Sequence, residues 1–152
     1  MATVKRATSG DAAKVRAAFD ALLPPDWREG PLIPVKRLET VLSDPRVILI
    51  LAEVEQSPVG FVSGRLTASL CGRGDTAILD DLFVKADSRG GGIGKALVRA
   101  FRAEALKTTS RPMRMWSGTG VDNAACRHVF EAEGANAVDE TYVEYVWDDA
   151  AD

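Results

Sequence analysis

The sequence predicts an α/β fold in which helices flank one mixed, mostly antiparallel sheet. Two observations lead to this prediction. Helical and strand patterns alternate along the chain without repeats, and a glycine-rich stretch, residues 89–94, stands between a predicted strand and a predicted helix. The chain has 152 residues, of which 46% are hydrophobic and 27% charged, as in ordinary globular domains. We therefore expect residues 1–152 to form a single domain.

The first third of the chain is predicted to hold two helices separated by a loop. Thr8 and Asp11 have capping-box spacing, and the apolar residues that follow fall on one helical face: Val15, Phe19 and Leu22. Four of the seven prolines lie within residues 23–34, which indicates a shaped loop. A short second helix through Val35, Leu38 and Leu42 is expected to end before Asp44-Pro45.

The rest of the chain supplies the predicted sheet and two further helices. Strands over residues 47–53 and 59–66 are expected to form a hairpin that turns at residues 56–58, and a third strand spans residues 76–84. A helix begins after the glycines, and a strand over residues 112–117 follows it. Asn123 is a good N-cap for a helix that Gly134 ends, and residues 142–147 form the last predicted strand.

Composition excludes several classes of protein. No apolar run of about 18 residues is present, and the N-terminus lacks a signal-peptide pattern, so we expect a cytoplasmic protein without a membrane span. The net charge is −3, and the basic segment 85–114 has few aromatic residues, which argues against nucleic-acid binding. Cys71, Cys126 and His128 lack the spacing of metal ligands, so no metal is expected.

The glycine-rich stretch indicates an anion-binding loop. Glycine loses much backbone entropy on folding, so glycines at three successive positions are a poor choice for stability alone. They allow the backbone to approach a ligand, and amide N–H groups at a helix start favour an anion. Arg89 and Lys95 add positive charge suited to a pyrophosphate.

Two common phosphate-binding patterns do not fit this stretch. The dinucleotide pattern G-x-G-x-x-G fails because Leu97 stands where the third glycine belongs. The nucleotide-binding pattern G-x-x-x-x-G-K-[ST] requires glycine at Arg89 and a hydroxyl at Ala96, and neither is present. A nucleotide-binding domain of another class is therefore disfavoured.

The segment from Leu79 to Leu97, with its strand, its [R/Q]-x-x-G-x-[G/A] pattern and its helix, resembles the cofactor motif of the GCN5-related N-acetyltransferases (GNAT). Asn123, Phe130 and Gly134 resemble a second motif of that family, N-x6-Y-x3-G. The strand Asp80-Asp81-Leu82-Phe83-Val84 is locally similar to the spermidine/spermine N-acetyltransferases. The resemblance covers nearly the whole chain and implies the GNAT fold.

The resemblance implies a site for acetyl-CoA as co-substrate. Backbone groups of Leu82, Phe83 and Val84 would pair with the pantetheine arm, as though it were an added strand. Asn123 and the helix that carries Phe130 would lie along the far side of the pantetheine. The amides of the glycine-rich loop would hold the pyrophosphate, through Arg89, Gly90, Gly91, Gly92, Ile93, Gly94 and Lys95.

The same resemblance implies acetyl transfer to a primary amine by direct attack. An alkyl amine has a pKa near ~10.4, so a carboxylate must take its proton. Asp80 matches the family position often given this role, and Asp81 matches one that can hold a cationic substrate. Neighbouring residues on a regular strand face opposite ways, so we expect the two carboxylates to point apart. Each could instead be an exposed or turn-bound carboxylate of the sheet.

Phe130 departs from the family pattern, because the tyrosine common at this position protonates the leaving thiolate and phenylalanine cannot. Water can serve instead, since a thiolate with a pKa near ~8.5 leaves without much help. A substitute acid such as Tyr142, Tyr145 or Cys126 is the second explanation. The third is a non-catalytic acetyl-CoA-binding module.

The acceptor is the least defined part of the expected site. No Lys or Arg follows Arg127, and this acidic end with Asp80 and Asp81 favours a cationic small molecule of the polyamine or aminoglycoside type. Its candidate contacts are Trp27, Arg28, Trp116, Tyr142 and Glu144. A homodimer completed by the last strand is the expected assembly.

Overall fold

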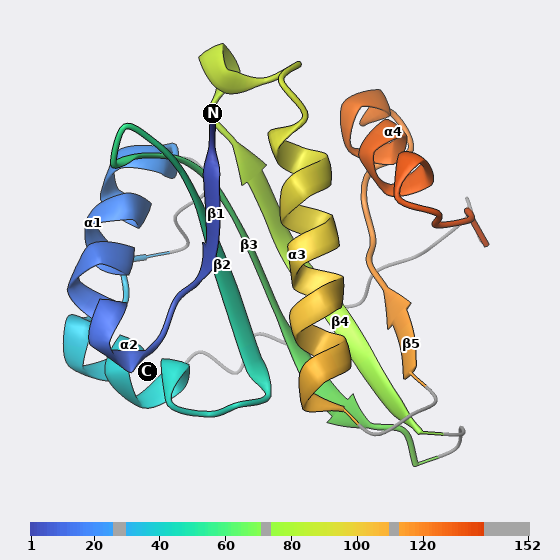
Figure 1. Ribbon diagram of the computed structural model, residues 1–152, viewed down its shortest axis with the longest axis horizontal. Helices are drawn as coiled ribbons and strands as arrows, with labels where there is room; N and C mark the ends of the chain where they lie inside the picture. The colour runs from blue at the N-terminus through green and yellow to red at the C-terminus, as the bar shows by residue number, and fades with distance from the viewer. Residues whose placement is uncertain (26–29, 71–73, 110–112, 139–152) are drawn as a thin grey trace.

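The computed structural model describes residues 1–25, 30–70, 74–109 and 113–138 (Figure 1). Five strands form one sheet in the order β1-β2-β3-β4-β5. The first four are antiparallel neighbours: β1 (Thr3–Arg6), β2 (Val47–Val54), β3 (Ser57–Ala68) and β4 (Asp75–Val84). β5 (Met113–Trp116) pairs with β4 in parallel, which confirms the predicted mixed, mostly antiparallel sheet.

Helices cover both faces of this sheet (Figure 1). α1 (Ala12–Leu22) and α2 (Val35–Leu42) pack on one face, and α3 (Ile93–Thr108) packs on the other, with α4 (Ala124–Ala132) beside it. β2 is buried on both sides, because Ile48 and Ile50 face α3 whereas Leu49 and Leu51 face α1 and α2. A continuous apolar run is the pattern of such a strand.

The predicted helices are confirmed, including their signals at the ends. The carboxylate of Asp11 accepts hydrogen bonds from the backbone N–H and the hydroxyl of Thr8, at 2.9 and 2.8 Å, in a 3-10 turn (η1, Ser9–Asp11) that leads into α1. Asn123 Oδ1 accepts the N–H of Cys126 at 3.1 Å and so caps α4. Gly134 follows α4 with φ +89°, the left-handed backbone typical of a helix end.

Two strand features differ from the prediction. β1 was not predicted, because a four-residue strand with alternating exposed and half-buried residues has little periodic signal. The hairpin turns at Glu55 and Gln56, both with positive φ, and not at residues 56–58. Pro58 lies inside β3, opposite a register shift between Ala52 and Glu53, where the ladder is already irregular. The predicted last strand lies outside the described residues.

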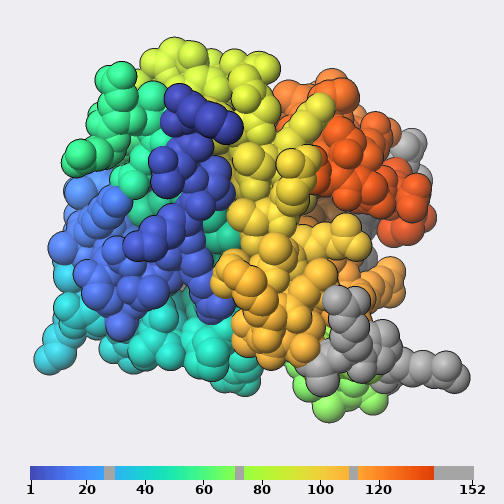
Figure 2. Space-filling view, in the orientation of Figure 1, coloured from blue at the N-terminus to red at the C-terminus, as the bar shows by residue number. Residues whose placement is uncertain are grey.

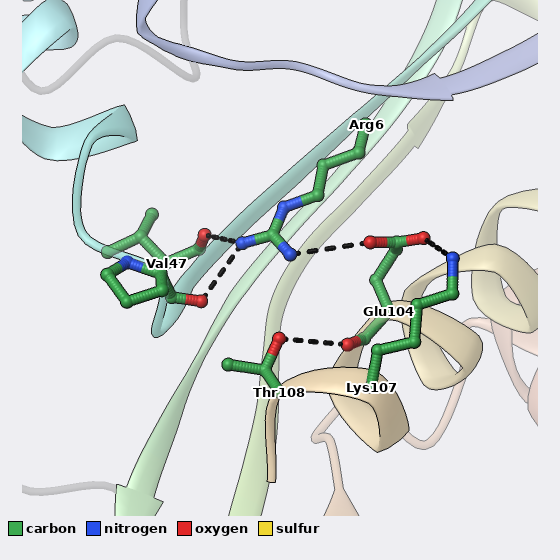
Figure 3. Close-up of polar contacts among 6 residues, drawn as sticks. Arg6, Val47, Glu104, Lys107 and Thr108 are labelled. Atoms are coloured by element: carbon green, nitrogen blue, oxygen red, sulfur yellow. Dashed lines mark hydrogen bonds and ion pairs between the residues drawn. The ribbon is translucent and has the colours of Figure 1, made fainter.

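A polar tether joins β1 to α3 (Figure 3). Arg6 donates to the carbonyls of Pro45 and Val47 at 2.9 and 3.0 Å and forms an ion pair with Glu104 at 3.3 Å. Glu104 also pairs with Lys107, and its backbone carbonyl accepts the Thr108 hydroxyl at 3.1 Å. The hydrogen bond from Lys107 is the largest cause that lowers the pKa of Glu104, and the hydrogen bond from Arg6 lowers it further.

Candidate active site at the end of β4

The predicted glycine-rich loop joins β4 to α3 at an open edge of the molecule. The chain leaves β4 at Val84, passes through a 3-10 turn (η3, Ala86–Ser88) and enters α3 at Ile93. Gly90 and Gly92 have φ of +81° and +80°, which favours glycine at both positions. Figure 2 shows this loop, in yellow-green, on the surface at the top of the molecule, and residues 90–92 are exposed.

A row of backbone donors lies where this loop meets α3. The helix is capped by Gly92, which has no side chain to accept the first N–H groups. Across the described ranges, no protein acceptor receives the N–H groups of residues 90–95. The helix dipole adds partial positive charge at the same end. This arrangement can bind a phosphate or pyrophosphate.

The two remaining glycines of the stretch have different surroundings. A Cβ at Gly94 would lie 3.3 Å from Cγ2 of Val129 and 3.9 Å from Cγ2 of Val84, so Gly94 permits close packing of α3 on α4 and β4. A Cβ at Gly91 would meet only the Ser88 carbonyl oxygen, at 4.0 Å, among the described atoms. Gly91 also lies outside the positive-φ region. The fold therefore does not itself explain glycine at position 91.

The basic residues of the loop are partly engaged with the protein. Arg89 donates from Nε to the carbonyl of Val84 at 2.9 Å, which ties the loop to the end of β4. Lys85 forms an ion pair with Asp87 at 3.0 Å, and the resulting hydrogen bond lowers the pKa of Asp87. Lys95 is half-buried in the first turn of α3. The loop thus carries positive charge beside its N–H groups.

β4 and β5 separate before β4 reaches this loop. Their pairing runs from Asp75–Met113 to Ile78–Trp116 and ends there, so residues 79–84 of β4 continue beyond the last β5 pair. Just past this point, the Ser117 hydroxyl donates to the carbonyl of Leu79 at 2.9 Å. The predicted pantetheine-binding residues Leu82, Phe83 and Val84 all lie in the continuing part of β4.

A β-bulge places both candidate carboxylates on one face of the sheet, so the expectation that they point apart was wrong. Ser63 pairs with Asp81 and Gly64 pairs with Leu79, which leaves Asp80 as the extra residue. Ser63 and Arg65, two apart on β3, share a face, and each contacts one of the carboxylates. The Ser63 hydroxyl donates to Asp81 at 2.6 Å, and Arg65 pairs with Asp80 at 2.5 Å.

Sequence reasoning missed Ser63 and Arg65, although a signal for both was present. On β3, Phe61 is buried, Ser63 is half-buried and Arg65 is exposed, so one face of the strand changes from apolar to polar along its length. Phe61 stacks on Phe83 with ring centroids 6.0 Å apart, on the face covered by α1 and α2. The carboxylates of Asp80 and Asp81 are exposed where that apolar cover ends.

The residues expected on the far side of the pantetheine lie on and before α4. The side-chain oxygen of Asn123 is used in capping the helix, and Phe130 packs against the core between α3 and the sheet. Cys126, one turn before Phe130, is a half-buried free cysteine. Trp116 is 47% exposed at the end of β5.

Several sequence predictions fall outside the residues that the structure describes: Tyr142, Tyr145, Glu144, Trp27, Arg28 and Cys71. Among the residues it describes, no group of three or more His, Cys, Asp or Glu side chains could hold a metal ion. None of the described helices has the length and apolarity needed to cross a membrane.

Comparison with solved structures supports the fold. An aminoglycoside acetyltransferase from an uncultured soil metagenomic sample, in complex with sisomicin, has a TM-score of 0.81 at 15% identity and covers 96% of this chain and 95% of its own. Aminoglycoside N-acetyltransferase AAC(6′)-Iy in complex with CoA has a TM-score of 0.73 at 18% identity, and the match covers 97% of this chain and 95% of that structure's chain. The ribosomal-protein-alanine N-acetyltransferase of Brucella melitensis biovar Abortus 2308 has a TM-score of 0.64 at 20% identity, and the match covers 97% of this chain and 98% of that one.

Sequence comparison identifies the family. No curated protein sequence matches the chain. The sequence profile of the acetyltransferase (GNAT) family, however, matches residues 13–135, from α1 through α4, and so includes both predicted motifs. The chain therefore belongs to the acetyltransferase (GNAT) family and is an enzyme of the acyltransferase class.

Proposed function

We propose that this enzyme is an acetyl-CoA-dependent N-acetyltransferase that moves an acetyl group to a primary amine by direct attack. The observation that carries the proposal is the row of N–H groups at residues 90–95, beside the point where β4 continues past β5. A polar site for a pyrophosphate that follows an open strand suits CoA, in which the pantetheine arm is joined directly to the pyrophosphate.

The described residues fit acetyl-CoA in a consistent order. The backbone of Leu82, Phe83 and Val84 pairs with the pantetheine arm, and the N–H groups from Gly90 to Lys95 bind the pyrophosphate. Glycine at position 91, which the fold does not explain, leaves room for that approach. Asn123 contributes through its amide nitrogen or backbone, because its side-chain oxygen already caps α4.

The chemistry needs a neutral amine and a leaving thiolate. An acceptor ammonium held at Asp81 gives a proton to the neighbouring Asp80, directly or through one water, and the amine nitrogen then attacks the thioester carbonyl carbon. The C–N bond forms, the C–S bond breaks and CoA leaves as a thiolate; the second proton, which the attacking nitrogen must lose to become a neutral amide, passes through water to this thiolate. Phe130 cannot supply this proton, and Cys126 is the described candidate for a substitute acid.

The acceptor that this site favours is a cationic small molecule of the polyamine or aminoglycoside type. Asp80 and Asp81 share one exposed face, so this face presents carboxylate oxygens to an approaching ammonium group. Two of the similar structures described above are aminoglycoside acetyltransferases, at identities that support a common fold.

Release of CoA from acetyl-CoA, measured over a panel of amines, tests the proposal. Asp80→Asn is expected to lower kcat/KM by about 100-fold or more, because general base help typically contributes ~10²–10⁴-fold. Asp44→Asn is a matched control, since Asp44 is also an aspartate paired with an arginine, Arg46, at 2.8 Å. Acetyl-CoA binding without CoA release on any amine would instead favour the non-catalytic module that Phe130 suggests.

A homodimer and a cytoplasmic location are also proposed for this enzyme. Light scattering after size-exclusion chromatography tests the first: a mass near twice the 16.3 kDa of one chain is expected. A single-chain mass at working concentration would contradict it.

A further inference from the structure

The carboxylates of Asp80 and Asp81 on β4 differ in what lies against them. Asp80 Oδ2 accepts from Nη1 of Arg65 at 2.5 Å, so a positive charge is in direct contact with it. Asp81 Oδ2 accepts from the Ser63 hydroxyl at 2.6 Å, which is a neutral partner. The charge of Asp80 is therefore compensated by a guanidinium, whereas among the described residues no basic side chain pairs with Asp81.

Stability does not account for the Arg65–Asp80 pair. The side chain of Arg65 is 54% exposed and that of Asp80 is 34% exposed. Exposed ion pairs contribute little to folding, because water screens the attraction and two side chains must be fixed. Nor does the pair link distant parts of the fold, since both residues lie on neighbouring strands already joined by a long antiparallel ladder.

We propose that Arg65 is a specificity-determining residue, which compensates Asp80 and directs the ammonium group of an acceptor to Asp81. This inference rests on the proposed acetyl transfer to a cationic amine. It also refines the proposed function: in the described part of the chain, Asp81 is the carboxylate of this pair that has no basic partner, so the site recognises one ammonium group. A second ammonium group on the same acceptor gains little, because the guanidinium of Arg65 occupies the neighbouring carboxylate.

Arg65→Gln tests this role with two probes of equal chain length, n-butylamine and 1,4-diaminobutane. The substitution removes the guanidinium charge and turns Asp80 into a second anionic partner on the same face. We expect the ratio of KM for the monoamine to KM for the diamine to rise about two- to five-fold, the range that one exposed charge pair supplies. Arg65→Lys keeps the positive charge and is expected to keep the wild-type ratio.

Two matched variants separate this role from a general change of charge. Arg102→Gln removes one exposed positive charge from α3, on the other face of the sheet, and is expected to leave the ratio unchanged. In an Asp80→Asn background, Arg65→Gln is expected to have no effect on diamine preference. In the Asp80→Asn background, the preference between the two amines is measured by the thermal shift that each produces, because this measurement does not require turnover.

The outcomes distinguish the inference from the proposed function. CoA release by wild type with either amine supports acetyl transfer, whereas release with none of a broad amine panel overturns it. An unchanged monoamine-to-diamine ratio in Arg65→Gln, in both KM and thermal shift, overturns the role of Arg65 alone. The role of Arg65 is also overturned if Arg102→Gln raises the monoamine-to-diamine ratio equally. The same holds if Arg65→Gln still changes the diamine preference in the Asp80→Asn background.

Discussion

Gly91→Ala separates what the glycine loop does for the fold from what it does for a ligand. The backbone at Gly91 lies outside the positive-φ region, unlike that of Gly90 and Gly92. An added Cβ meets one described atom, the Ser88 carbonyl oxygen, at 4.0 Å, which is an ordinary contact distance. The methyl group therefore projects into the space where a ligand phosphate is proposed to lie.

The expected effects on stability and on binding have opposite signs. Replacing glycine by alanine without strain raises the free energy of unfolding by about 0.4–1 kcal/mol, because the unfolded chain loses freedom. A methyl group that keeps one backbone N–H from a charged phosphate costs about 1.5–3 kcal/mol of binding energy. That loss corresponds to a Kd for acetyl-CoA raised about 10- to 150-fold.

Urea unfolding and calorimetric titration with acetyl-CoA measure the two effects on the same protein. Gly10→Ala is the control, since Gly10 lies in η1, its Cβ would meet described atoms no closer than 3.8 Å, and it is remote from the loop. An unchanged Kd in Gly91→Ala would refute the close approach of a phosphate at this residue. A destabilised Gly91→Ala protein would refute the view that the fold does not need this glycine.

Three further outcomes are expected. Phe130→Tyr should raise kcat for acetyl transfer, measured as CoA release, because a tyrosine hydroxyl supplies the acid that water or a substitute group replaces in the wild type; an unchanged kcat would contradict an acid role at this position. Because its pKa is lowered, Glu104 stabilises the fold above its ordinary value of 4.5, and this contribution is lost as the pH falls through the lowered value; urea midpoints of Glu104→Gln should therefore fall less steeply on acidification than those of wild type. Gly64→Ala should cost about 1–3 kcal/mol or more in urea unfolding, because its Cβ would lie 2.1 Å from the Ile78 carbonyl oxygen and 2.6 Å from the Phe101 ring; wild-type stability would contradict that packing.

The loop of the proposed cofactor site could be predicted from the sequence because its signals are local. A glycine cluster between a strand and an amphipathic helix defines both the loop and its exposed N–H groups within one continuous segment. The helix N-cap at Asn123 and the helix end at Gly134 are likewise short-range signals, and both were confirmed.

The contacts of the candidate carboxylates could not be predicted in the same way, because they depend on pairing between strands. Arg65 and Asp80 are 15 residues apart and meet only through the register of β3 and β4. The bulge did leave a trace in the sequence. Ala77 and Leu79 face α3 at odd positions, whereas Leu82 and Val84 face it at even positions. A change of phase within one apolar strand indicates an extra residue.

The bulge in β4 also bears on the length of the chain. Leu79 stays opposite Gly64, and Asp81 stays opposite Ser63, whether or not a residue stands between them. A chain shortened by one residue at Asp80 would therefore keep the apolar residues on both sides of the deletion in their places and lose one carboxylate. At this point of the sheet, the loss of one residue would leave the pairing of the flanking residues unchanged. A side chain can therefore be gained or lost here by insertion or deletion as well as by substitution.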